Sequence, residues 1–251
     1  MSNLDPNFAA ARTGYRSDQV AIDAGLRAYM IRVYNYMTAG VALTGLVAWV
    51  TYSAAVVDTG AGLELTQFGH AIFASPLMWL FLLAPLGLVM LLSFGIDRLS
   101  AGTALTIFFI YAALLGLSLA SIFLVYTHGS IARVFFISAA TFGATSFYGY
   151  TTQRDLTSVG SFMFMGLIGL IIASVVNIFL RSTGLDWAIS VIGVIVFVGL
   201  TAYDTQRIKE SYDVNDDGTI SGRKAVMGAL RLYLDFINLF LMLLRILGDR
   251  R

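Results

Sequence analysis

Two aspartates stand in the apolar carboxy-terminal half of the chain, where a carboxylate is costly. Asp204 directly follows an apolar run in "VFVGLTAYDTQRIK", and Asp235 lies near the middle of "ALRLYLDFINLFLMLLRIL". Ionisable groups inside apolar helices are expensive to bury and are candidates for function. On neighbouring helices, such a pair could share one proton, bind a divalent cation through oxygen, or activate water for peptide hydrolysis.

A mostly polar stripe accompanies the second aspartate. Its members are spaced as on one face of a helix, and they are Arg231, Asp235, Asn238, Met242 and Arg245. A purely structural reading pairs Arg231 with Asp235 and extends Arg231 and Arg245 towards the two membrane interfaces. That reading explains the arginines better than it explains Asp235. Asp204, on the preceding helix, is the natural partner for Asp235.

Further oxygen donors lie between the two aspartates, in "DVNDDGTISGRK". Positions one, three, five and nine of an EF-hand calcium loop are matched by Asp213, Asn215, Asp217 and Ser221. The last position should carry a bidentate Glu, and here it is Lys224. Gly and Asp or Asn residues are also what a tight polar turn requires. We therefore predict a polar turn, with a weak cytoplasmic cation site as the alternative.

Composition indicates which elements must position these residues. The chain of 251 residues is 58% hydrophobic and 12% charged, whereas soluble domains carry about 25% charged residues. This composition predicts an integral membrane protein in a lipid bilayer. The net charge of +1 argues against nucleic acid as a partner. The chain has no cysteine, which excludes disulfides, thiolate catalysis and Cys-ligated metal.

The apolar segments predict an all-α bundle of about seven transmembrane helices. A span needs roughly 20 apolar residues, and the candidates are Tyr34–Val57, Pro76–Gly95, Thr103–Tyr126, Ile131–Tyr150, Val159–Leu180, Leu185–Tyr203 and Val226–Leu247. We expect residues 1–32 to form a cytoplasmic tail with an interfacial helix, and residues 33–251 to form one transmembrane domain. Small residues are expected to let helices approach closely, and they recur at Ala139, Gly143, Gly166, Gly169 and Ala173.

The distribution of basic residues predicts the orientation of the chain. Arginines precede the first span, and further Lys and Arg residues fall in the second, fourth and sixth loops, whereas the first loop has neither. The positive-inside rule then places the amino terminus in the cytoplasm.

Several enzyme classes lack necessary parts. His70 and His128 have no H-E-x-x-H context, and the chain has no P-loop. Intramembrane aspartyl proteases pair a "YD" with Gly-x-Gly-Asp, but here the second aspartate stands in "LYLD". Without those glycines a substrate backbone could not approach Asp235 closely. We therefore expect no enzymatic activity and no cofactor.

Several stretches resemble the transmembrane Bax inhibitor motif family, in its bacterial branch. They are "LYLDFINLFLMLLRILG", "AYDTQRIK", "SPLMWLFLLAPLGLVMLLSF" and "AGLRAYMIRVYNYMTAG". The resemblance implies a seven-helix bundle around a central last helix, in the bacterial cytoplasmic (inner) membrane. It also implies a pH-sensitive calcium leak gated by a buried aspartate pair, with Ca²⁺ as the permeant ion. The family's pair maps onto Asp204 and Asp235.

Some members of this family hold the aspartates with an arginine latch after the second span. Arg98 is the only basic residue of the matching stretch "SFGIDRLSAG", and Arg207 or Arg231 are alternative counter-charges. Asn238 and Arg245 are further candidates for the pore lining. Three other functions stay open. One is a membrane-embedded modulator of a partner complex such as a protease. The other two, which the sequence favours less, are a proton-coupled cation exchanger and an intramembrane aspartyl protease.

Overall fold

The computed structural model describes residues 6–60 and 62–251, with side chains from residue 23 onwards except that of residue 82. The helices are α1 (Pro6–Ala55), α2 (Gln67–Phe73), α3 (Leu77–Gly95), α4 (Ala101–Leu119), α5 (Ile122–Val125), α6 (His128–Thr151), α7 (Thr157–Leu180), α8 (Thr183–Glu210) and α9 (Gly218–Leu247). A 3-10 turn, η1 (Ile96–Arg98), follows α3. The predicted all-α membrane bundle is confirmed.

Six helices of the described chain are long and apolar enough to cross a membrane. They coincide with the first six predicted spans, and α4 and α5 together make the third. The seventh predicted span, α9, is as long as the others but falls outside this set. Its polar stripe and the charged turn that precedes Val226 lower its hydropathy. A helix with such a stripe needs protein rather than lipid on its polar side.

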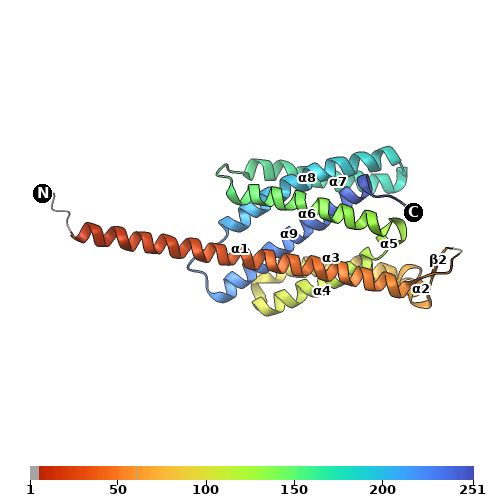
Figure 1. Ribbon diagram of the computed structural model, residues 1–251, viewed down its shortest axis with the longest axis horizontal. Coiled ribbons are helices and arrows are strands. Elements are labelled where there is room, and N and C mark those ends of the chain that lie inside the picture. Colours follow the sequence, from red (N-terminus) through yellow and green to blue (C-terminus); the bar gives the residue numbers. More distant parts are fainter. Residues whose placement is uncertain (1–5, 61) are drawn as a thin grey trace.

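The last helix is central, as expected. It packs against α1, α4, α6 and α8, and Figure 1 shows it crossing between α1, α3 and α4 on one side and α6, α7 and α8 on the other. Tyr233 of α9 is fully buried and its hydroxyl lies 2.6 Å from Thr44 Oγ1 of α1. Because α9 is surrounded by protein, it can carry groups that lipid would exclude.

The amino-terminal region differs in form from the expected tail. Its first five residues lie outside the described part of the chain, but from Pro6 to Ala55 the backbone is one continuous helix. The expected interfacial helix and the first span are therefore one element. A short hairpin of β1 (Val56–Asp58) and β2 (Leu63–Leu65) then precedes α2, and the sequence analysis did not anticipate it.

Close helix approach occurs at Gly166, as expected, where a Cβ would lie 3.0 Å from Val196 of α8, and at a glycine that we did not expect. A Cβ at Gly143 or Gly169 would meet nothing within 4 Å. At Gly149 of α6, a Cβ would collide with the backbone carbonyl of Ala202 on α8. The expectation for Gly143 and Gly169 is wrong, because small size permits close approach only where a residue faces a neighbouring helix.

We expect Gly149→Ala to destabilise the bundle by about 1–3 kcal/mol, because the added methyl must push α6 away from α8. Thermal unfolding of the detergent-purified protein, followed by circular dichroism, would measure this loss. Gly143→Ala is the matched control on the same helix and should leave the midpoint unchanged or slightly higher. Equal midpoints for the two variants would contradict the proposed close contact.

Candidate functional site

The two aspartates meet at the contact between α8 and α9, the most extensive helix pair of the bundle. Asp235 is only 5% exposed, and its Oδ2 has no hydrogen-bond partner in the described part of the chain. The carboxyl groups of Asp204 and Asp235 lie close enough across this contact for each to act on the other. Two ionised carboxylates are both acceptors, so a bond between them requires one proton.

An arginine stands at the outer side of this pair. Arg231 Nη1 lies 4.0 Å from Asp204 Oδ1, and the two side chains are 42% and 18% exposed. Arg231 and Arg207 also line a cavity of about 260 Å³, and Arg207 donates a 2.8 Å hydrogen bond to the Tyr203 hydroxyl. The pair therefore has a buried end at Asp235 and an accessible, basic end at Asp204.

The polar stripe of α9 runs along α8. At its far end, Arg245 Nη1 lies 3.5 Å from Asp186 Oδ1 of α8. Between the two ends, Met242 fills the space left by Gly193, and Asn238 Nδ2 donates to the Leu234 carbonyl at 2.8 Å. The stripe is thus the α8-facing side of α9.

The structure separates the candidate counter-charges. Arg231 lies beside Asp204, and Arg207 acts on the same carboxyl from its own helix. Arg245 forms an ion pair with Asp186 at the opposite end of the stripe. Arg98 lies in η1, where it makes no ion pair or side-chain hydrogen bond with the rest of the described chain.

The loop that resembles a calcium site uses its oxygens within itself. Asp213 Oδ1 accepts from the Asn215 amide nitrogens at 2.9 and 3.0 Å, and these hydrogen bonds lower the pKa of the Asp213 carboxyl. Asp217 Oδ1 accepts from Ile220 N at 2.7 Å and caps α9. Ser221 lies in the first turn of α9. These contacts are those of a capped polar turn.

A cation already occupies the closing position of this loop. Lys224 Nζ donates to Asp216 Oδ2 at 2.6 Å and to the Ser211 carbonyl at 3.0 Å. Across the described residues there is no cluster of three or more His, Asp or Glu side chains that could hold a metal ion. The ammonium group therefore makes the contacts that tie the end of α8 to the start of α9.

Buried hydroxyl groups near the aspartates were missed by the sequence analysis. The Tyr34 hydroxyl of α1 is hydrogen-bonded to Ser146 Oγ of α6, which lies 2.9 Å from Thr205 Oγ1 of α8. Thr205 directly follows Asp204. A single sequence contains no sign of this chain of hydroxyls, because its members come from three helices that are remote in sequence.

Comparisons with known proteins match nearly the whole chain. The family model described as Inhibitor of apoptosis-promoting Bax1 matches residues 26–251. Inner membrane protein YbhL of Escherichia coli strain K12 is 50% identical over 240 residues, covering 94% of this chain and 98% of that protein. Uncharacterized protein RP147 of Rickettsia prowazekii is 47% identical, covering 94% of this chain and 95% of its own. A protein of Caulobacter vibrioides is 41% identical over the full length of both chains.

We expect Asp217→Ala to lower thermal stability by about 0.5–2 kcal/mol, because α9 loses its side-chain cap. Asn215→Ala is the control, since it removes an EF-hand-like oxygen but leaves the cap intact. Neither midpoint should depend on millimolar Ca²⁺. A wild-type midpoint that rises with Ca²⁺, in an effect lost in both variants, would identify the loop as a calcium site.

Proposed function

Because the chain belongs to the Bax inhibitor family of membrane proteins, we propose that it is a pH-sensitive, calcium-permeable leak channel of the bacterial inner membrane. The observation that carries the proposal is the buried carboxyl of Asp235, placed on the central helix beside that of Asp204. Such a pair responds to protons, and ionised carboxylates are preferred ligands of Ca²⁺. The proposal assigns the chain no catalytic reaction and no cofactor.

The gate in this proposal is the contact between α8 and α9. With one proton between them, the aspartates hold the two helices together, and Arg231 attracts the remaining negative charge of Asp204. A second proton removes that charge and releases Arg231. The contact between α8 and α9 then loses the charge-assisted interaction between Arg231 and Asp204. The two helices are held less firmly, so acid favours the open form.

The cavity beside Arg231 supports a route for the proton. It is lined by Arg207 and Arg231, which both act on the partly exposed carboxyl of Asp204, whereas Asp235 is buried. Protons can therefore arrive through Asp204 without crossing the apolar core. The amino terminus and this cavity lie on the cytoplasmic side in the proposal, as the distribution of basic residues predicts.

We expect Asp204→Asn to remove the pH dependence of calcium flux into liposomes, and Asp235→Asn to move the midpoint of that dependence. Asparagine does not titrate, so flux through Asp204→Asn should vary by less than about twofold between about pH 5 and pH 8, at a level close to that of the acid-opened wild type, whereas Asp204 still titrates beside Arg231 in Asp235→Asn. Calcium-indicator fluorescence in liposomes of the purified protein would measure the flux.

Asp186→Asn is the matched control for both variants, because Asp186 pairs with an arginine of α9 at the other end of α8. This control should keep the wild-type pH profile. A wild-type profile that survives in both Asp204→Asn and Asp235→Asn would reject the aspartate gate. Wild-type protein that shows no flux at any pH, yet co-purifies with one membrane complex, would instead support the modulator function.

We expect Arg231→Gln to raise calcium flux at neutral pH. The pair with Asp204 is long and partly exposed, so its loss should change the closed population by up to about fivefold, corresponding to about 1 kcal/mol. Arg245→Gln is the control, since it removes an arginine from the same stripe without touching the aspartates. An equal rise in both variants would show that the effect is general destabilisation of α9.

A further inference from the structure

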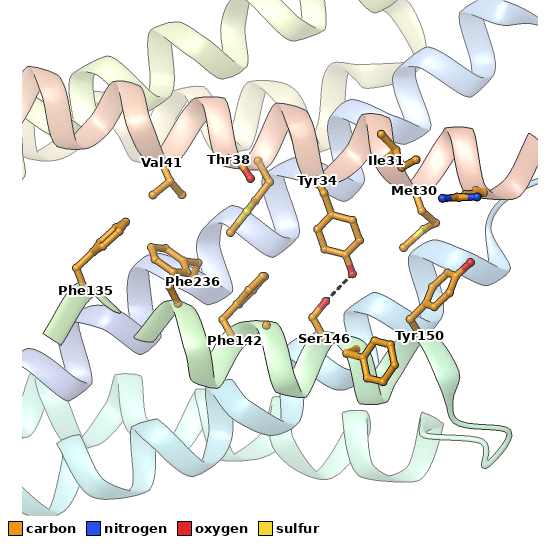
Figure 2. Close-up of a pocket in the computed structure, with 15 residues that line it drawn as sticks. Met30, Ile31, Tyr34, Thr38, Val41, Phe135, Phe142, Ser146, Tyr150 and Phe236 are labelled. Atoms are coloured by element: carbon orange, nitrogen blue, oxygen red, sulfur yellow. Dashed lines mark hydrogen bonds between the residues drawn. The ribbon is translucent and has the colours of Figure 1, made fainter. Parts of the chain in front are cut away.

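A long open seam separates α1 from α6. Within the described residues these two helices have no extensive direct packing, although both pack against α9. The space between them forms a cavity of about 680 Å³ whose lining includes Phe236 of α9. Figure 2 shows side chains of α1 and α6 facing each other across this space. We call it the α1–α6 seam.

The walls of the α1–α6 seam are mostly apolar and open towards lipid. They include Met30 and Ile31 of α1 and Phe135 and Phe142 of α6, and Figure 2 shows Met30, Phe135 and Phe142 pointing into the space. Ile31 is 49% exposed, as is usual for an apolar side chain that faces lipid. Between these apolar walls, the Tyr34 hydroxyl reaches across to Ser146 Oγ. An apolar space of this size in a bilayer is suited to hydrocarbon.

The length of the seam matches one leaflet. On α1 it extends from Arg27 to Val41, which is about 21 Å along a helix axis. Half of a bilayer, with its headgroup region, is about 20–22 Å thick. A second cavity of about 370 Å³ shares Val41, Phe135 and Phe236 and continues to His128. The larger cavity is thus about as long as one leaflet is thick, and the smaller one continues from its far end.

Positive charge is found at the end of the larger cavity. Arg27 lines this end, and no described carboxylate lies within ion-pair distance of it. Opposite, at the end of α6, Lys209 Nζ donates to the Tyr150 carbonyl at 2.9 Å and lies 5.4 Å from the centre of its ring. Tyrosine is typical of the depth at which lipid headgroups lie. Arg27 therefore stands at the end of the apolar space, next to Tyr150 and the Lys209 that contacts it.

We propose that the α1–α6 seam binds one anionic phospholipid, with an acyl chain between the two helices and the phosphate at Arg27. A phospholipid has a charged headgroup at one end and acyl chains about as long as one leaflet is thick. The seam has the same arrangement, with a positive charge at one end and apolar walls of similar length. Arginine is well suited to phosphate oxygens, and basic sites between transmembrane helices bind anionic headgroups. The proposal is independent of calcium conduction, so failure of either leaves the other standing.

The test is lipid retention by the full-length protein in detergent, measured by native mass spectrometry after addition of palmitoyl-oleoyl phosphatidylglycerol or the phosphatidylcholine with the same chains. Wild-type protein should retain one phosphatidylglycerol in preference to phosphatidylcholine. Gly143→Leu places a side chain in the open space of the seam and should reduce retention about tenfold or more. Arg27→Gln should bind the two lipids equally, because only the headgroup contact is lost.

Two matched controls separate the seam from the general surface. Gly169→Leu also fills open space, on α7 away from the seam, and Arg32→Gln removes an exposed arginine of α1 that does not line it. Both should retain lipid as the wild type does. Unchanged retention in Gly143→Leu would overturn the proposal, and so would release of a bound polypeptide or a change of oligomeric state without loss of lipid.

A measurement on the unaltered protein keeps the proposal falsifiable if Gly143→Leu fails to fold. Phosphatidylglycerol with a photoreactive group in its acyl chain should label the segments around Ile31 and Phe142. The adducts would be located by peptide mass spectrometry, with competition by unlabelled phosphatidylglycerol. Labelling confined to other helices, or labelling that phosphatidylcholine displaces equally well, would reject the site.

Discussion

A carboxyl group in the middle of the central helix is the constraint on which the rest of the structure depends. Asp235 is too buried for water to solvate its carboxyl group. One of its oxygens also has no hydrogen-bond partner in the described chain. A buried, unpaired charge is strongly destabilising. The neighbouring helix presents Asp204 beside Asp235, and one proton shared by the two carboxyl groups would leave one negative charge there instead of two. Arg231 in turn stands where it can offset the charge of Asp204.

Different faces of the central helix, α9, contact different parts of the bundle. Its polar stripe faces α8, and both ends of the stripe are held by ion pairs with that helix. Its aromatic side contacts α1 and α4, where Tyr233 packs against Phe108 and bonds to Thr44. Phe236, the residue after Asp235, lines the α1–α6 seam. The aspartate pair and the seam thus lie on adjacent sides of one helix.

The loop between α8 and α9 shows why a ligand pattern is weaker evidence than ligand geometry. Asp213 and Asp217 match an EF-hand by position, but each accepts hydrogen bonds from its own turn. Lys224 supplies a fixed positive charge to the same loop. Local hydrogen bonds compete for side-chain oxygens, and in this loop they form a helix cap and a turn.

The sequence by itself determined the membrane class, the positions of the spans and the two aspartates with their stripe. Hydropathy and helical periodicity are properties of short segments, so they can be read along one helix at a time. Only the tertiary structure decided that Arg231 rather than Arg98 lies beside Asp204, that Gly149 rather than Gly143 is the close contact, and that α1 and α6 leave a seam. Each of these depends on the rotation and separation of helices remote in sequence, which the pattern within a single helix does not specify.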